Sequence, residues 1–236
     1  MKKLAVVTGG SQGIGKALLL QLAREGFSLA TCARNEVLLK EVQQEINERY
    51  PDVFFFYQQA DMSRRHDVQQ FAEAVTRLAT PVDILINNAG VFIPGQIHTE
   101  DEGVFEQTMH TNVFGVYHLT RALLPGMIER RRGHVFNVCS TASTTAYVNG
   151  GSYCVSKFAL LGMGKVLREE LKPHNIRVTS VLPGATLTAS WEGTELPSDR
   201  FMPPEDVAEA ILAAYRLSAR TVVEELVLRP QLGDIT

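Results

Sequence analysis

Short apolar runs alternate with amphipathic stretches along almost all of this chain of 236 residues. The apolar runs predict strands, and the stretches between them carry apolar residues at helical spacing. We predict strands at residues 4–8, 27–33, 53–57, 82–86, 135–138, 176–182 and 222–228. After the fourth run, Thr99-x-x-Glu102 has the spacing of a capping box and predicts the start of a long helix. Such alternation predicts a doubly wound α/β fold: a parallel sheet of about seven strands, helices on both faces and right-handed crossovers.

The length and composition are those of one globular domain. Apolar residues make up 45% of the chain and charged residues 21%, which is the profile of a soluble protein with a sizeable core. No internal repeat, low-complexity tract or linker divides the sequence, so we predict a single domain over residues 1–236. The one long irregular segment, residues 185–203, contains the only tryptophan, Trp191. A loop of that length in a compact domain is either functional or disordered, and we predict that it is a substrate loop.

Charge, histidine spacing and cysteine usage disfavour several classes of protein. The net charge of −3 gives no sign of a nucleic-acid or membrane partner, and no apolar segment approaches the ~20 residues that span a bilayer. The histidines show no paired spacing, so we predict no metal site. Cys32, Cys139 and Cys154 lie in apolar or strand-like runs without paired spacing, which predicts a reducing compartment, the cytoplasm. We interpret Cys139 and Cys154 as small core residues.

A glycine-rich turn follows the first predicted strand and reads T-G-G-S-Q-G-I-G from Thr8 to Gly15. Such a turn lets backbone amides approach a pyrophosphate, and the N-terminus of the next helix adds partial positive charge. Tight turns need glycine for conformational reasons alone. The first strand-to-helix turn of an alternating chain is nevertheless where a dinucleotide binds, so we interpret this segment as a dinucleotide-binding turn.

The end of the second predicted strand bears on the choice of dinucleotide. An acid there hydrogen-bonds the ribose 2′-hydroxyl of NAD, whereas an arginine suits the 2′-phosphate of NADP. The chain reads Cys32-Ala33-Arg34-Asn35, with no acid and with an arginine at the strand end. An ordinary surface arginine is the alternative, and Gln12 stands where a second basic residue would have strengthened the case. We predict NADP rather than NAD.

Tyr153 and Lys157 stand four residues apart at the predicted start of a helix, so their side chains lie on one face, one turn apart. A tyrosine hydroxyl has an unperturbed pKa of about 10. A nearby ammonium lowers that pKa and makes the tyrosine a better proton carrier near neutral pH. A lone Y-x-x-x-K pattern is more simply explained by a half-buried tyrosine and a solvated lysine, so the rest of the chain has to decide.

Taken together, these motifs resemble those of the compact short-chain dehydrogenases/reductases over essentially the whole chain. The family's T-G-x-x-x-G-x-G is matched by Thr8 to Gly15, its acid after the third strand by Asp61, its N-N-A-G by Asn87 to Gly90 and its helix asparagine by Asn112. Its serine thirteen residues before the tyrosine is matched by Ser140, its Y-x-x-x-K by Tyr153 with Lys157, and its P-G-x-x-x-T by Pro183-Gly184 with Thr188. Each motif alone is weak, and their order and spacing make the set specific. The resemblance implies a Rossmann-type fold.

The resemblance also implies roles for particular residues. The catalytic residues would be Asn112, Ser140, Tyr153 and Lys157. Tyr153 would be the general acid for ketone reduction, Lys157 would hold the nicotinamide ribose and lower the tyrosine pKa, Ser140 would bind the substrate carbonyl, and Asn112 would anchor a water. The cofactor NADP(H) would be bound by Gly9, Ser11, Gln12, Gly13, Ile14, Gly15, Arg34, Asp61, Asn88, Ala89, Gly90, Tyr153, Lys157, Pro183, Gly184, Thr186 and Thr188. We expect Tyr147 and Trp191 to line the substrate pocket with Ser140, although either is equally well explained by ordinary packing.

Two departures from the family pattern concern the cofactor and the assembly. Thr186 stands where the family usually has Val or Ile. The C-terminus lacks the D-G-G that follows the last strand in many relatives and often builds a tetramer interface. We therefore expect a homodimer through the helices bearing Asn112 and Tyr153, with a homotetramer as the alternative.

The resemblance implies an NADPH-dependent oxidoreductase that reduces a ketone or aldehyde of a small molecule to an alcohol. A 3-oxoacyl-[acyl-carrier-protein] reductase and an NAD-linked secondary alcohol dehydrogenase are alternatives, and Arg34 disfavours the second. From another class, a non-catalytic NADP-sensing regulator stays open. Such regulators usually lose the tyrosine or the lysine, and this chain keeps both.

Overall fold

The computed structural model describes residues 3–78, 80–191 and 193–235. Within these ranges, one sheet holds seven strands in the order β3-β2-β1-β4-β5-β6-β7, and every neighbouring pair is parallel. The strands are β1 (Leu4–Thr8), β2 (Ser28–Ala33), β3 (Phe55–Gln59), β4 (Val82–Asn87), β5 (Gly133–Val138), β6 (Ile176–Pro183) and β7 (Glu225–Leu228). The predicted doubly wound parallel sheet is confirmed.

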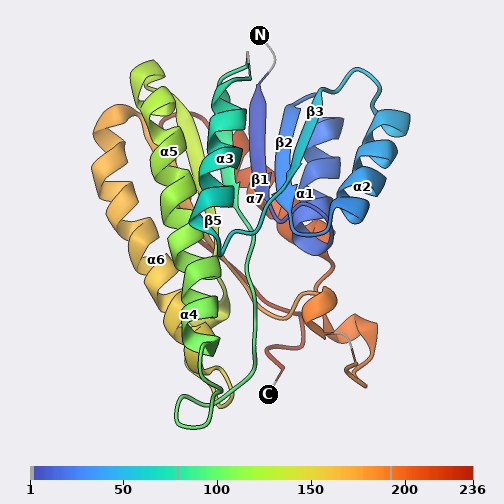
Figure 1. Cartoon of the computed structure of the whole chain (residues 1–236), viewed down its shortest axis with the longest axis vertical. Helices are drawn as coiled ribbons and strands as arrows, with labels where there is room; N and C mark the ends of the chain where they lie inside the picture. Colours follow the sequence, from blue (N-terminus) through green and yellow to red (C-terminus); the bar gives the residue numbers. More distant parts are fainter. Residues whose placement is uncertain (1–2, 79, 192, 236) are drawn as a thin grey trace.

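Helices cover both faces of the sheet (Figure 1). They are α1 (Gly13–Arg24), α2 (Glu36–Arg49), α3 (Arg65–Thr76), α4 (Val104–Met109), α5 (Gly115–Arg130), α6 (Gly151–Leu171) and α7 (Pro204–Arg216). A π-helical segment, η1 (His110–Phe114), joins α4 to α5. One apolar core packs α1, α2 and α7 against the sheet, and the other packs α3 and α5 against the opposite face.

Strand β1 shows why the sheet needs helices on both sides. Its side chains alternate between the two cores, with Ala5 and Val7 in one and Leu4 and Val6 in the other. All four are completely buried. A strand without a polar face has no surface to offer to water, so both of its faces must be covered by packed helices.

Several element boundaries differ from the sequence prediction. The third strand begins at Phe55, because Val53 donates its N–H to the Tyr50 carbonyl in a turn that ends α2. The predicted capping box at Thr99 and Glu102 is wrong: the helix begins at Val104 after Gly103, whose φ is 90°. The Thr99 hydroxyl instead donates to the Gln96 carbonyl within the preceding turn. The last strand is shorter than predicted and starts at Glu225.

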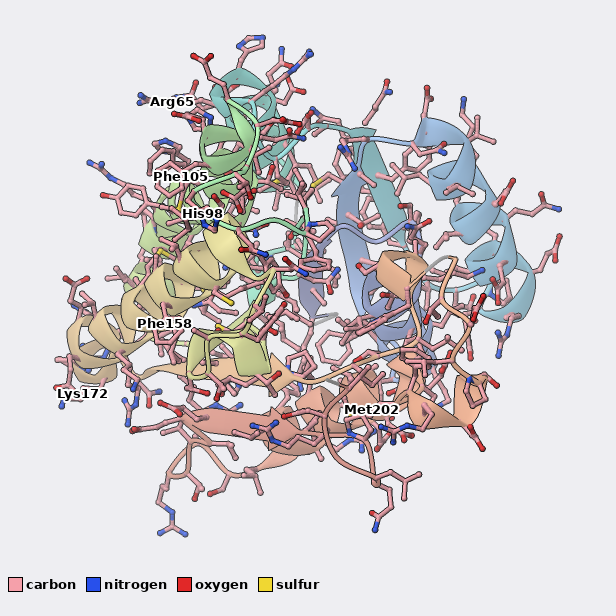
Figure 2. All side chains as sticks on the ribbon, turned by 90° about the horizontal axis from the view of Figure 1, so that it is seen from below. Arg65, His98, Phe105, Phe158, Lys172 and Met202 are labelled. Carbon is pink, nitrogen blue, oxygen red and sulfur yellow. The ribbon has the colours of Figure 1, made fainter. Side chains whose placement is uncertain are left out.

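The strand order fixes where a ligand fits. The chain leaves β1 for β2 on one side and later returns to β4 on the other side, which leaves a crevice beyond the carboxyl end of β1. Open α/β sheets bind their ligands at such a switch point. The loops that follow β4 and β6 and the C-terminus gather at this end, the lower end in Figure 1, and Figure 2 looks onto it.

Candidate active site

A cleft of about 1000 Å³ opens at the carboxyl end of the sheet. Most residues that the sequence predicts for the site line it: Gly9, Ser11, Gln12, Gly13, Ile14, Arg34, Asp61, Asn88, Ala89, Gly90, Ser140, Tyr147, Tyr153, Lys157, Pro183, Gly184, Thr186, Thr188 and Trp191. Gly15 and Asn112 do not line the cleft and are buried behind it. The structure thus gathers motifs from both halves of the chain around one cavity.

The glycine turn brings the start of α1 close to the end of β1. A side chain on Gly15 would place its Cβ 2.1 Å from the Gly9 carbonyl oxygen, so only glycine permits this approach. Asn88 holds the turn from β4, because its side-chain amide donates to the Thr8 carbonyl oxygen at 2.9 Å. The Thr8 hydroxyl oxygen accepts from the backbone N–H groups of Asn88 and Ala89, each at 3.0 Å. The N-N-A-G motif therefore fixes the shape of the turn.

The N-terminus of α1 is suited to an anion. Its N-cap residue, Gln12, makes no side-chain capping bond, and the first turn contains no acidic residue. The first N–H groups of a helix have no partner within the helix, and the helix dipole gives that end partial positive charge. Because these groups face a cleft lined by glycine, they fit the pyrophosphate of a dinucleotide.

Two charged residues, Arg34 after β2 and Asp61 after β3, also line the cleft. Arg34 is exposed at the end of β2, and no ion pair among the described residues involves it. One carboxylate oxygen of Asp61 accepts from the Ser63 N–H at 2.9 Å and from the Ser63 hydroxyl at 2.8 Å. Arg34 is therefore a guanidinium that is in no ion pair with the described residues, and Asp61 is a carboxylate fixed by Ser63 that lines the same cleft.

Tyr153 and Lys157 are brought together on the first turns of α6. The Lys157 Nζ lies 5.6 Å from the centre of the Tyr153 ring and donates to the Val138 carbonyl oxygen at 2.9 Å. The lysine is only 5% exposed, and none of the ion pairs among the described residues includes it. The tyrosine ring packs against Phe92 in a T-shaped arrangement, with ring centres 4.9 Å apart. A buried ammonium and a held phenol thus share one wall of the cleft.

Ser140 stands at the end of β5, facing the same cleft. Its hydroxyl oxygen accepts from the Ala142 N–H at 3.1 Å, and its own N–H donates to the Ser143 hydroxyl at 3.2 Å. These bonds fix the side chain, and the Ser140 O–H is donated to none of the described residues. It is available to a carbonyl oxygen in the cleft.

Asn112 lies behind the cleft wall in the π-helical segment η1, completely buried. Its side-chain oxygen accepts from the Val91 N–H at 2.8 Å, and its amide donates to the Val91 carbonyl and to the Ser156 hydroxyl, both at 3.0 Å. Ser156 in turn donates to the Tyr153 carbonyl at 2.7 Å. The Asn112 side chain therefore joins the loop after β4 to the helix that carries Tyr153. π-helical turns are frequent at functional sites.

Tyr147 and Trp191 also line the cleft. Tyr147 is half exposed, and burial of its hydroxyl raises the pKa of that group. Trp191 packs on Phe201, with ring centres 4.9 Å apart, and lies in the loop that follows β6. The structure thus brings both side chains to the cleft that Ser140 lines.

The cysteines are poor candidates for redox or nucleophilic chemistry. Burial raises the pKa of Cys139 to about 11 and that of Cys32 to about 12, so both thiols are protonated near neutral pH. Cys154 is buried as well. Among the described residues, no group of three or more metal-ligating side chains comes together. No helix in these ranges has the length and apolar character to cross a membrane.

A second cleft, of about 1110 Å³, lies at the opposite end of the sheet and is rich in cations. Most of these side chains are already engaged. Arg130 donates to the carbonyls of Gly126 and Val82, Arg131 donates to the Pro173 carbonyl, and Arg132 pairs with Asp83. They satisfy carbonyl groups at helix and strand ends, which is a structural role.

Sequence reasoning missed several residues of the cleft. Phe92 and Val148 line it, and so do Asp234 and Ile235 from the C-terminal tail. The tail turns back because the Gly233 N–H bonds the Pro230 carbonyl and Gly233 takes a φ of 83°. The P-x-x-G spacing after the last strand was the available signal for that turn. No local pattern marks Phe92 or Val148.

Known proteins match the chain over its length. The family model described as short chain dehydrogenase matches residues 3–197. The sepiapterin reductase of Chlorobaculum tepidum is 34% identical over 243 aligned residues, which cover 100% of this chain and 99% of the relative.

Solved structures agree with that match. An alcohol dehydrogenase from the archaeon Thermococcus sibiricus, complexed with 5-hydroxy-NADP, is 28% identical with a TM-score of 0.91, and the match covers 100% of both chains. The L-sorbose reductase of Gluconobacter frateurii, complexed with NADPH and L-sorbose, is 26% identical with a TM-score of 0.88, covering 97% of this chain and 95% of that one.

Proposed function

The chain belongs to the short-chain dehydrogenase/reductase family and is an NADP-dependent oxidoreductase, and on that premise we propose that it reduces a ketone or aldehyde to an alcohol. One observation carries the proposal. The Tyr153 ring, with the buried Lys157 ammonium beside it, shares a cleft with a Ser140 hydroxyl whose hydrogen finds no acceptor in the part of the chain that the structure describes. A carbonyl placed between them meets a hydrogen-bond donor and a proton donor.

The cleft fits NADP(H) along its length. The uncapped N-terminus of α1 takes the pyrophosphate, and the glycine turn leaves room for it. Arg34 takes the 2′-phosphate, since a guanidinium binds phosphate through paired charge-assisted hydrogen bonds. The relatives solved with NADP or NADPH support this choice. NAD would leave Arg34 without its partner, which disfavours an NAD-linked alcohol dehydrogenase.

The protein's own groups stabilise the charge that develops on the substrate. When bound, the nicotinamide supplies the hydride. Negative charge then builds on the carbonyl oxygen, where Ser140 donates a hydrogen bond and Tyr153 delivers the proton. Lys157 holds a positive charge beside the ring and stabilises the phenolate that is left. The Asn112 side chain lies behind the cleft wall, where its hydrogen bonds connect α6 to the loop after β4.

The substrate is a small molecule with a carbonyl group. The match to a sepiapterin reductase over the full length of both chains favours a ketone attached to a pterin ring. A 3-oxoacyl thioester is the second candidate, since an apolar cleft with a few polar groups also admits an acyl chain. A regulator that only senses NADP would not need Ser140, Tyr153 and Lys157 all directed into one cleft, so we rank it below an enzyme.

Turnover and cofactor preference test the proposal. Purified protein is assayed by nicotinamide absorbance with NADPH or NADH against a pterin ketone, an acetoacetyl thioester, vicinal diketones and aromatic aldehydes. We expect reduction with NADPH to exceed reduction with NADH. In Tyr153→Phe we expect the rate to fall by about 100-fold or more, because the general acid is lost, while NADPH still binds. Reduction that persists undiminished in Tyr153→Phe would contradict the mechanism, and NADPH binding without any turnover would favour the regulator.

A further inference from the structure

Helix α6, which carries Tyr153 and Lys157, supplies no cap of its own. Its N-cap residue is Gly150, which has no side chain to accept a bond, and its first turn contains no acidic residue. The first N–H groups of a helix still require acceptors. An acceptor for the start of α6 therefore has to come from elsewhere in the chain. The N–H group that it binds belongs to Ser152, the residue before Tyr153.

Glu100, from the loop between β4 and α4, provides that acceptor. One of its carboxylate oxygens accepts from the Ser152 N–H at 2.8 Å, across 52 residues of sequence, and the other accepts from the Ser152 hydroxyl. Ser152 is only 2% exposed. A carboxylate on a helix N-terminus gains from charge-assisted hydrogen bonds and from the helix dipole. Both oxygens of Glu100 are thus bound to the residue that precedes the proton donor.

Two glycines allow the loop between β4 and α4 to pack closely against the start of α6. A Cβ on Gly151 would lie 2.0 Å from a Glu100 carboxylate oxygen, and a Cβ on Gly95 would lie 2.6 Å from the Glu100 Cγ. The Gly95 N–H also donates to the Asn149 carbonyl at 3.0 Å. Gln96 donates its side-chain amide to the Asn149 side-chain oxygen, also at 3.0 Å. The loop is docked on the start of α6 at several points.

The same loop holds the Tyr153 ring itself. Phe92, near the start of the loop, packs against the Tyr153 ring in a T-shaped arrangement, and Glu100, near the end of the loop, binds the residue before Tyr153. The ring and the backbone of the tyrosine are therefore held by one segment. We propose that Glu100 is a positioning residue for Tyr153: it fixes the first turn of α6 so that the tyrosine hydroxyl meets the substrate carbonyl. This inference rests on the proposed reductase function and extends it.

The expected consequence is a loss of turnover rather than a loss of cofactor. Proton transfer depends on the placement of the donor to within a fraction of an ångström, and a small misplacement lowers the rate by up to about 100-fold. The NADPH phosphates are bound by the glycine turn and Arg34, which Glu100 does not touch. Loss of Glu100 should therefore lower kcat and leave the affinity for NADPH near that of the wild type.

The test compares Glu100→Ala with two further variants. In Glu100→Ala we expect kcat to fall by about 10- to 100-fold. Glu100→Gln keeps an oxygen acceptor for the Ser152 N–H and should recover most of that loss. Glu102→Ala removes a neighbouring exposed acid of the same loop and is the control that should keep wild-type kcat. Each variant is measured for kcat, KM for the ketone and Kd for NADPH.

Hydrogen exchange of residues 150–157 gives a second measurement that needs no turnover. With NADPH bound, the amides of this segment should exchange about 10-fold faster or more in Glu100→Ala than in the wild type, since the first turn of α6 loses its cap. Exchange in Glu102→Ala should not change. Unchanged exchange and unchanged kcat in Glu100→Ala would each overturn the inference. A wild-type protein without turnover would refute the reductase proposal instead, and the exchange result would still decide whether Glu100 fixes this turn.

Discussion

Arg34 is the side chain on which we expect the choice between NADPH and NADH to depend. It is exposed at the end of β2 and lines the cleft. In Arg34→Ala we expect KM for NADPH to rise by about 10- to 100-fold, because a charge-assisted pair with the 2′-phosphate is worth about 1.5 to 3 kcal/mol. The rate with NADH should change little, since NADH lacks that phosphate. Initial rates with both cofactors measure the effect.

Lys40 provides the matched control for Arg34. It is an exposed cation on α2 that pairs with Glu36 and does not line the cleft. Lys40→Ala should keep the NADPH preference of the wild type. If it weakened the preference as much as Arg34→Ala, the effect would come from the general surface charge and not from a specific phosphate site.

His134 is a buried histidine on β5 whose neutral form the fold requires. It is completely buried, and its Nε2 lies 2.8 Å from the Thr179 hydroxyl oxygen. Thr179 already donates its own hydrogen to the Val223 carbonyl at 2.6 Å, so Nε2 carries the proton and donates to Thr179. Burial, with the Arg177 charge as a smaller cause, lowers the pKa of His134 to about 2.

The pKa of His134 makes the protein less stable in acid. The folded-state pKa lies far below the unfolded value of about 6.5, so below pH 6.5 the unfolded chain binds a proton that the folded chain does not. The contribution of His134 to the free energy of unfolding is therefore fully present above pH 6.5, and it falls as the pH decreases below that value. The expected slope is about 1.4 kcal/mol per pH unit, or about 2 kcal/mol between pH 6.5 and pH 5.

Replacement of His134 tests this pH dependence. His134→Leu removes the titrating group, and Thr179 keeps its bond to Val223. Between pH 7 and pH 5 the variant should lose about 2 kcal/mol less unfolding free energy than the wild type, measured by urea unfolding at each pH. His66→Gln, at an exposed position on α3, should keep the wild-type slope. Equal slopes in His134→Leu and the wild type would show that His134 is not the source.

The strands could be predicted from the sequence, and the caps of the helices could not. A strand such as β1 is apolar on both faces because helices cover both sides of the sheet, so its pattern is local and strong. The acceptor at the start of α6 comes from a residue that is distant in the sequence. The sequence assigned an acid, Glu102, to the start of the helix next to it, whereas the structure uses Glu100 to cap α6.

The motifs of the site could be predicted from the sequence for the same reason as the strands, because their patterns are local. The glycine turn and the Tyr153–Lys157 pair each follow from spacing along one element, and the structure places them in one cleft. The hydrogen bonds of the Asn112 side chain could not be predicted from the sequence. It lies in a π-helical segment and bonds to Val91 and Ser156, residues that come from two other elements. Only the tertiary arrangement shows that it acts behind the cleft wall.

The two ends of the molecule differ in their use of charge. At the carboxyl end of the sheet, Arg34 and Lys157 are in no ion pair among the described residues and face a cleft, so they are available to a ligand. At the amino end, Arg130 and Arg131 bond backbone carbonyls and Arg132 pairs with Asp83. Cations of the same type therefore serve binding at one end and structure at the other.

The outer face of η1, α5 and α6 bears on the assembly of the whole molecule. Together with the neighbouring α4, it carries large apolar side chains that water reaches: Phe105, Phe114, Tyr117, Val155 and Phe158. Figure 2 shows Phe105 on α4 and Phe158 on α6 on the same side of the molecule. Several large apolar side chains exposed on one side of a molecule are typical of an interaction site. A second copy of the chain is the expected partner, as predicted for the helices that bear Asn112 and Tyr153.

We expect the protein to be a homodimer through this face and expect charge to disrupt it. In a twofold interface the same patch meets itself, so one substitution acts twice. Phe158→Glu combined with Tyr117→Glu would place like charges against each other, which costs several kcal/mol. Sedimentation equilibrium at micromolar protein should show a dimer for the wild type and a monomer for the double variant. Val37→Glu, at an exposed apolar residue on α2, should stay dimeric. A double variant that falls only from tetramer to dimer would favour the homotetramer, and a wild type that is monomeric at high concentration would refute this interface.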